Sequence, residues 1–146
     1  LNAYLLLCLI ALPAAARADG DHSAPKGIPR FGENSAVTAF DAEEGFKMSE
    51  ASLKTLGVRF TRLEGPAPWI VPKDALVRIK HTLGIYRRVE GWISFVLLQS
   101  ATPKANTLLI RSEDLMPGDE IASEGASFLR MTEADLNSDT VDSCSH

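Results

Sequence analysis

The chain has 146 residues, of which 45% are hydrophobic and 23% charged, and its 19 acidic and 15 basic side chains give a net charge of −4. This length suits one domain with its own core, and the acidic balance excludes nucleic acid as a partner because binding it needs a basic face. Of the two cysteines, Cys8 lies in an apolar N-terminal run, so Cys144 has no partner for an intramolecular disulfide after that run is removed.

The N-terminus has the pattern of a signal peptide. Apolar residues run almost unbroken from Leu5 to Ala16, and the run ends in an Ala-Arg-Ala cleavage signature. About twelve apolar residues fall well short of the roughly twenty that a bilayer span needs. We therefore expect residues 1–18 to be cleaved and the chain from Asp19 onward to be exported, soluble and without a membrane span. Loss of Arg17 reduces the 15 bases to 14 against 19 acids, a net charge of −5.

The first half of the remaining chain predicts a lead-in, a strand, a helix and a second strand. Residues 19–35 are rich in Gly, Pro, Asp and Ser without periodicity, which indicates a flexible segment. Residues 36–40 alternate as a short strand, which we expect to pair with a strand from the C-terminal half. Ser49 is expected to cap a short helix that ends at Gly57, and a strand over 58–63 follows.

The second half begins at residues 65–69, a proline-rich segment. Its prolines have no backbone N–H to donate to a strand ladder, so we expect this segment to form a corner. Strands are predicted over 76–80 and 85–89. The Glu90-Gly91 pair is typical of a two-residue hairpin turn, and it leads into a third strand over 92–99. These strands predict a three-stranded meander.

The C-terminal part predicts a loop over 102–106, a strand over 107–111 and two paired strands over 120–123 and 126–131. Residues 132–146 are polar and acidic and are expected to form a disordered tail.

Together these elements predict one mainly β domain over residues 36–131, an antiparallel β-roll or barrel with one short helix. Its core is expected to contain the apolar residues that fall on the inner positions of these elements: Val37, Phe40, Leu53, Leu56, Val58, Phe60, Ile79, Tyr86, Phe95, Leu109, Ile121 and Phe128.

The sequence does not predict an enzyme. It contains no nucleophile elbow, no HExxH zinc helix, no glycine-rich phosphate loop and no CxxC pair. His81 falls in a predicted turn, where a solvated polar side chain is expected. The paired acids also lie in hydrophilic turns, without the apolar neighbours that raise the pKa of a carboxyl group.

The end of the chain carries the residues with plausible coordination chemistry. Cys144 and His146 are two positions apart, and His22 lies in the lead-in. A thiolate with imidazoles suits Zn or Cu(I), although a structural zinc site wants four ligands. The alternative interpretation is a polar tail that ends in histidine by chance.

Three segments of the second half share a pattern with a known family: IVPKDAL, IYRRVEGWISFVLL and DLMPGDEIASEGASFL. The matching positions are Val71, Pro72, Ala75, Leu76, Glu90, Gly91, Leu115, Pro117, Gly118, Asp119, Glu120, Ile121 and Gly125. The pattern resembles the membrane-proximal domain of periplasmic adaptor proteins, or membrane fusion proteins, of resistance-nodulation-division (RND) efflux systems, the heavy-metal branch especially. FKMSEASLKTLGVRFTRLEG in the first half is similar to the short helix and strand that begin many adaptors, so the resemblance covers residues 36–131.

The resemblance implies a periplasmic protein that docks on an inner-membrane efflux pump protein. A complete adaptor inserts a β-barrel, a lipoyl domain and a helical hairpin between the two halves, whereas GPAPW joins them directly here. The first hypothesis is therefore a non-enzymatic accessory or degenerate adaptor. The alternative is a periplasmic metal-binding carrier that uses the terminal Cys and His residues, and an enzyme ranks last.

Four residues are candidates for contact with a pump protein. Trp69 lies in the proline-rich corner and Trp92 follows the Glu90-Gly91 turn, so both are expected near the rim of the domain. Arg87 and Arg88 would add charge complementarity to an acidic partner. The alternative for the two tryptophans is that each indole covers one end of the core.

Overall fold

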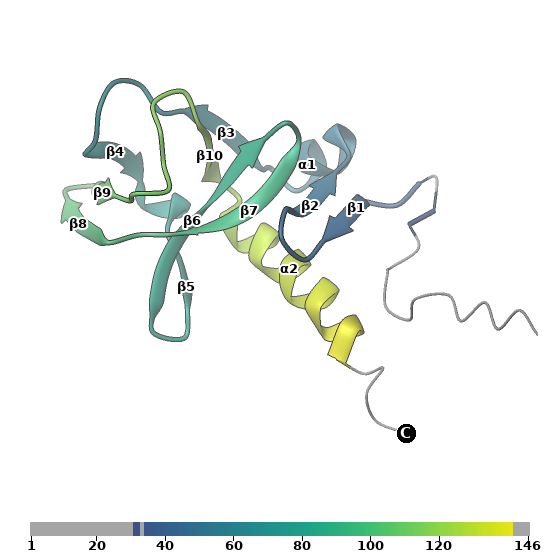
Figure 1. Ribbon diagram of the computed structural model, residues 1–146. Helices are drawn as coiled ribbons and strands as arrows, with labels where there is room; N and C mark the ends of the chain where they lie inside the picture. The colour runs from purple at the N-terminus through teal and green to yellow at the C-terminus, as the bar shows by residue number, and fades with distance from the viewer. Residues whose placement is uncertain (1–30, 33, 142–146) are drawn as a thin grey trace, which may run out of the picture.

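The computed structural model describes residues 31–32 and 34–141, and this part of the chain forms two β-sheets and two α-helices (Figure 1). The large sheet contains β1 (Val37–Asp41), β2 (Gly45–Met48), β3 (Arg59–Arg62), β5 (Val77–Ile79), β6 (Thr82–Val89), β7 (Trp92–Leu97) and β10 (Glu120–Glu124). The small sheet contains β4 (Trp69–Pro72), β8 (Ser100–Lys104) and β9 (Thr107–Arg111). The helices are α1 (Glu50–Thr55), α2 (Ala126–Val141) and the 3₁₀ turn η1 (Lys73–Ala75). The predicted mainly β class with antiparallel pairing is confirmed, although the sheets are open rather than closed into a barrel.

The long strand β6 organises the large sheet because it pairs along both of its edges. β7 follows one edge, as the Glu90-Gly91 turn predicts. On the other edge, β5 pairs with the start of β6 and β10 with its end, where Ile121 lies opposite Arg87. β10 in turn pairs with β3, so that Ala122 lies opposite Phe60. The two halves of the chain, which meet in sequence at the proline-rich corner, thus share one sheet.

The large sheet has a hydrophobic core on each face. Successive side chains of a strand point to opposite faces, so Ile85 and Tyr86 on β6 enter different cores. The first core lies between the large sheet and the two helices and contains Val37, Phe46, Met48, Leu53, Val58, Val77, Tyr86, Ile93, Ala122, Ala126, Leu129 and Leu136. The second lies between the two sheets and contains Leu63, Trp69, Val71, Ala75, Ile85, Val96, Leu108, Ile110, Leu115 and Ile121.

Local sequence signals place the short helix and the central hairpin correctly. Ser49 caps α1, because its Oγ accepts a hydrogen bond of 3.2 Å from the backbone N–H of Ser52. Gly57 takes a φ of 68°, the left-handed conformation expected just after a helix. Glu90 and Gly91 have φ of 51° and 82°, as the two central residues of a type I′ turn require.

The predicted pairing of the first strand is wrong. Among the described residues, β1 pairs only with β2. The strand β2, which was not predicted, connects this hairpin to β7 through the pair Phe46 and Ile93. The predicted loop over 102–106 is also wrong, since β8 continues to Lys104 and the chain turns at Ala105 with a φ of 51°. The lead-in is not wholly without contacts, because Phe31 packs against the first core.

The last predicted strand, residues 126–131, is instead the start of the helix α2, which runs on into the predicted tail as far as Val141. Gly125, with a φ of 73°, ends β10 and redirects the chain. Ala126, Leu129 and Leu136 then lie on one helical face and enter the first core, which stabilises the helix. Neither helix of the described residues is long and apolar enough to cross a bilayer.

The predicted core is right in part. Val37, Leu53, Val58, Tyr86 and Ile121 are buried. Phe40, Leu56, Phe60, Ile79 and Phe95 are half-buried and pack against the first core, and Leu109 is half-buried on β9 between the buried Leu108 and Ile110. Phe128, predicted as core, is 43% exposed because it falls on the outer face of α2 rather than the inner face of a strand.

A hydrogen bond between side chains also holds α2 to the large sheet. The Tyr86 hydroxyl donates a hydrogen bond of 2.7 Å to Oε2 of Glu133, and the same oxygen lies 3.3 Å from Nη1 of Arg130. Burial of the phenol, followed by its hydrogen bond to Glu133, raises the pKa of Tyr86 well above its usual value. The phenol therefore stays neutral as long as the helix stays packed on the sheet.

This raised pKa predicts a loss of stability in alkali. The unfolded chain releases the tyrosine proton near pH 10, whereas the folded chain retains it. The contribution of Tyr86 to the free energy of unfolding is therefore fully present below about pH 10. Above that pH it falls by up to about 1.4 kcal/mol per pH unit. In a Tyr4→Phe variant, Tyr86 is the only tyrosine. Its tyrosinate absorbance should appear together with unfolding followed by circular dichroism, and Tyr86→Phe should lessen the alkaline loss of stability. Ionisation near pH 10 with the fold intact would contradict the assignment.

Candidate partner-binding surface

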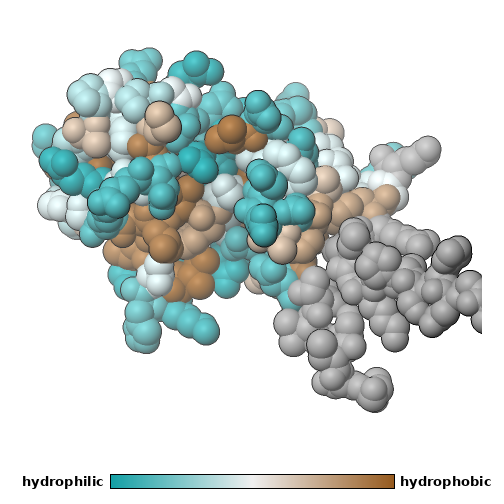
Figure 2. All heavy atoms as spheres, viewed as in Figure 1, coloured by the Kyte–Doolittle hydropathy of each residue, from teal (hydrophilic) through white to brown (hydrophobic). Residues whose placement is uncertain are grey.

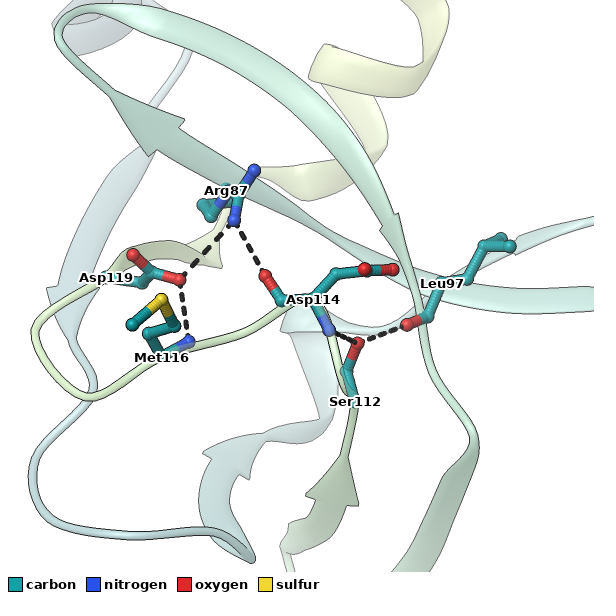
Figure 3. Close-up of polar contacts among 6 residues, drawn as sticks. All are labelled: Arg87, Leu97, Ser112, Asp114, Met116 and Asp119. Atoms are coloured by element: carbon teal, nitrogen blue, oxygen red, sulfur yellow. Dashed lines mark hydrogen bonds and ion pairs between the residues drawn. The ribbon is translucent and has the colours of Figure 1, made fainter.

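Arg87, a predicted partner contact, holds a loop of its own chain instead. Its Nη1 donates a hydrogen bond of 2.7 Å to the backbone oxygen of Asp114 and lies 3.6 Å from Oδ2 of Asp119 (Figure 3). The carboxylate of Asp119 also accepts a hydrogen bond of 2.9 Å from the backbone N–H of Met116. The charge of Arg87 is therefore compensated within the chain and is not free to pair with a partner.

The same loop contains the Pro117-Gly118-Asp119 turn, the most specific part of the family pattern. Ser112 fixes its start, because its Oγ donates to the backbone oxygen of Leu97 at 2.7 Å and accepts from the N–H of Asp114 at 3.2 Å (Figure 3). Leu115, buried at 5% exposure, anchors the loop in the second core. The Pro-Gly-Asp segment thus has a structural explanation that does not need a partner.

Arg88, the other predicted charge, points to the opposite face of β6 and is also paired. Its Nε lies 3.0 Å from Oε2 of Glu120, and its Nη1 lies 3.3 Å from Oε1 of Glu50. The guanidinium carbon lies 4.0 Å from the centroid of the Phe60 ring, in the geometry of a cation–π contact. Arg88 therefore connects β6 to β10, α1 and β3.

The two tryptophans differ in exposure. Trp69 is buried at 5% exposure in the second core, and its Nε1 donates a hydrogen bond of 2.9 Å to the backbone oxygen of Gly65. Its indole covers one end of the core and offers almost no area to a partner, so Trp69 does not belong to a docking surface. Trp92 is half-buried at the rim, with Nζ of Lys47 4.6 Å from its ring centroid.

An apolar surface that the sequence analysis did not identify lies at the end of β7. Leu97 is 54% exposed there, next to the half-buried Phe95, and Ile79 on β5 is half-buried on the same face. Gly84 lies between them on β6, with the ring of Phe95 packed above it. Figure 2 shows apolar side chains gathered here, above the hydrophilic tip of the β5–β6 hairpin. We call Ile79, Phe95 and Leu97 the apolar surface.

The sequence signal for this surface was present but ambiguous. The run from Ile93 to Leu98 contains one polar residue, Ser94, so both faces of β7 carry apolar side chains. One face is buried under the small sheet, and α2 covers only part of the other. The sequence alone could not show where α2 would leave the sheet exposed.

The predicted metal ligands, His22, Cys144 and His146, lie outside the described residues. Within 31–32 and 34–141, the structure has no group of three or more His, Cys, Asp or Glu side chains placed to hold a metal ion.

Three comparisons with known proteins were made, against family models, curated proteins and solved structures. None of the three gives a significant match to this chain.

Proposed function

We propose that the protein is a non-enzymatic accessory, or degenerate adaptor, of an RND-type efflux system, and that it binds an inner-membrane pump protein from the periplasm. The observation that carries this proposal is the pairing of β3 with β10. The segments before and after the proline-rich corner form one sheet without any inserted domain, as a membrane-proximal domain reduced to its two halves would require. The exported state that the N-terminal pattern predicts agrees with this location.

The apolar surface is the docking site that fits this function best. Its half-buried members pack against the first core and Leu97 is exposed beside them, so that a partner would extend an existing packed cluster. The arginines first considered for this role are paired within the chain, and reversing their charge would disturb the fold rather than test binding. An exposed leucine can be changed without that complication.

Capture from membranes tests the proposal. Wild-type protein should retain a pump protein from detergent-solubilised inner membranes, and Leu97→Glu should lose it because a carboxylate would be buried at the contact. Ile70→Glu is the matched control, since Ile70 is 60% exposed on β4 of the small sheet. Circular dichroism checks that both variants are folded. If the wild type captures no membrane protein, the proposal is wrong.

A further inference from the structure

A groove between β5 and α2 gathers positive charge in an otherwise acidic protein. The groove has a volume of about 600 Å³. Lys73 of η1, Arg78 of β5 and Leu76 between these elements line it on one side, and Phe128 and Arg130 line it from the first two turns of α2. We call this site the basic groove; Figure 1 shows β5 and the start of α2, which carry these residues.

Two of its cations are not compensated by the chain. Lys73 and Arg78 are exposed and form no ion pair with any residue of the described part of the protein. Arg130 pairs with Glu133 at 3.3 Å, and Asp74 is the single acid that lines the groove. Two unpaired bases therefore face one acid in a chain whose net charge is −4. A local surplus of this kind attracts carboxylates.

The groove also offers apolar contact. Phe128 is 43% exposed at its rim, and Leu76 and the buried Val77 lie at its wall. An exposed aromatic ring can pack against an apolar side chain of a partner, while the unpaired basic side chains beside it pair with the partner's carboxylates. A flat anionic membrane would leave such a concave site unfilled, whereas a chain segment can enter it.

We propose that the basic groove binds an acidic protein segment, whose carboxylates pair with Lys73 and Arg78 while an apolar side chain packs against Phe128. The inference rests on the proposed function in one respect, namely that the segment belongs to the pump protein. It adds the chemistry of the partner and a second contact, which shares no residue with the apolar surface.

A peptide titration tests the groove directly. The probe is a fluorescein-labelled peptide in which Glu and Asp alternate with Leu, and the reference probe has Gln and Asn in place of the acids. The full chain should bind the acidic probe and not the neutral one. Lys73→Gln combined with Arg78→Gln should weaken binding about tenfold, since each exposed pair contributes up to about 1 kcal/mol. Phe128→Ala should also weaken binding, without any change in charge.

A matched pair of substitutions separates the groove from general electrostatic attraction. Lys104→Gln combined with Arg111→Gln removes the same charge from exposed positions of the small sheet and should leave the affinity unchanged. Equal weakening by both pairs, or absence of binding, would overturn the inference. So would binding of phosphatidylglycerol vesicles, but not of the peptide, that depends on Lys73 and Arg78.

The membrane capture experiment distinguishes the two proposals. If the double variant at Lys73 and Arg78 still captures the pump protein as well as the wild type does, the proposed function stands and the groove is not its contact. If the peptide binds the groove but no pump protein is captured, the groove binds an acidic segment of some other protein and the proposed function fails.

Discussion

Replacing Phe46 by alanine should lower the free energy of unfolding by about 3 to 5 kcal/mol, the range for removal of a fully buried aromatic ring. Phe46 is 0% exposed and lies at the centre of the first core. Its ring meets Tyr86 edge to face, with the centroids 6.3 Å apart, and it faces Ile93 across the only pairing between β2 and β7. The substitution would leave a cavity where the β1–β2 hairpin joins the sheet.

Phe128→Ala is the control for this experiment. The same atoms are removed, but Phe128 is 43% exposed on α2, so the loss should stay below about 1 kcal/mol, as for surface substitutions. Urea denaturation followed by circular dichroism measures both values. Comparable losses at the two positions would mean that the packing of α2 described above is wrong.

The features that could be predicted from the sequence are those that depend on neighbouring residues. A cap at Ser49, a left-handed glycine at 57 and a two-residue turn at Glu90-Gly91 each need only a few consecutive side chains, and the structure contains all three. The meander of β5, β6 and β7 follows from such turns. The antiparallel pairing of these three strands could therefore be derived without knowledge of distant contacts.

The errors arise where distant packing decides the structure. β2 is four residues long, too short for alternation to be visible, and forms because β7 is available to pair with it. Residues 126–131 alternate enough to suggest a strand, yet Leu129 enters the core only as part of a helix, with Leu136 two turns further on. Sequence periodicity over six residues could not separate these two cases.

The candidate partner residues show the same limit. Arg87 and Arg88 are adjacent charges on a strand, which suggests a solvated basic pair, but their partners Asp119 and Glu120 lie 32 positions along the chain from each of them. Sequence reasoning could not pair them because the crossing of β10 onto β6 is a tertiary feature. For Trp69, burial in the second core decided between the two interpretations that the sequence left open.

The second large effect is expected at Gly45, the residue that starts β2 after the turn at Asp41. The Oδ1 of Asp41 accepts hydrogen bonds from the N–H groups of Glu44 and Glu43, which lower the pKa of this carboxyl group and keep the turn tight. Gly45 has a φ of 99°, and an added Cβ would collide with the backbone oxygen of Ile93. Because that oxygen belongs to the backbone of a central strand, it cannot move aside as a flexible side chain would.

We expect Gly45→Ala to lower the free energy of unfolding by about 3 kcal/mol or more, the sum of a positive-φ strain of about 1 to 2 kcal/mol and of the displacement of β2 from β7. Gly118→Ala separates the two terms. Gly118 has a nearly identical φ of 97°, but nothing lies within 4 Å of its added Cβ, so only the strain should be measured there. Urea denaturation of both variants gives the difference directly. If the two losses are equal, the backbone conformation alone requires glycine at position 45, and the close approach of β2 to β7 does not contribute.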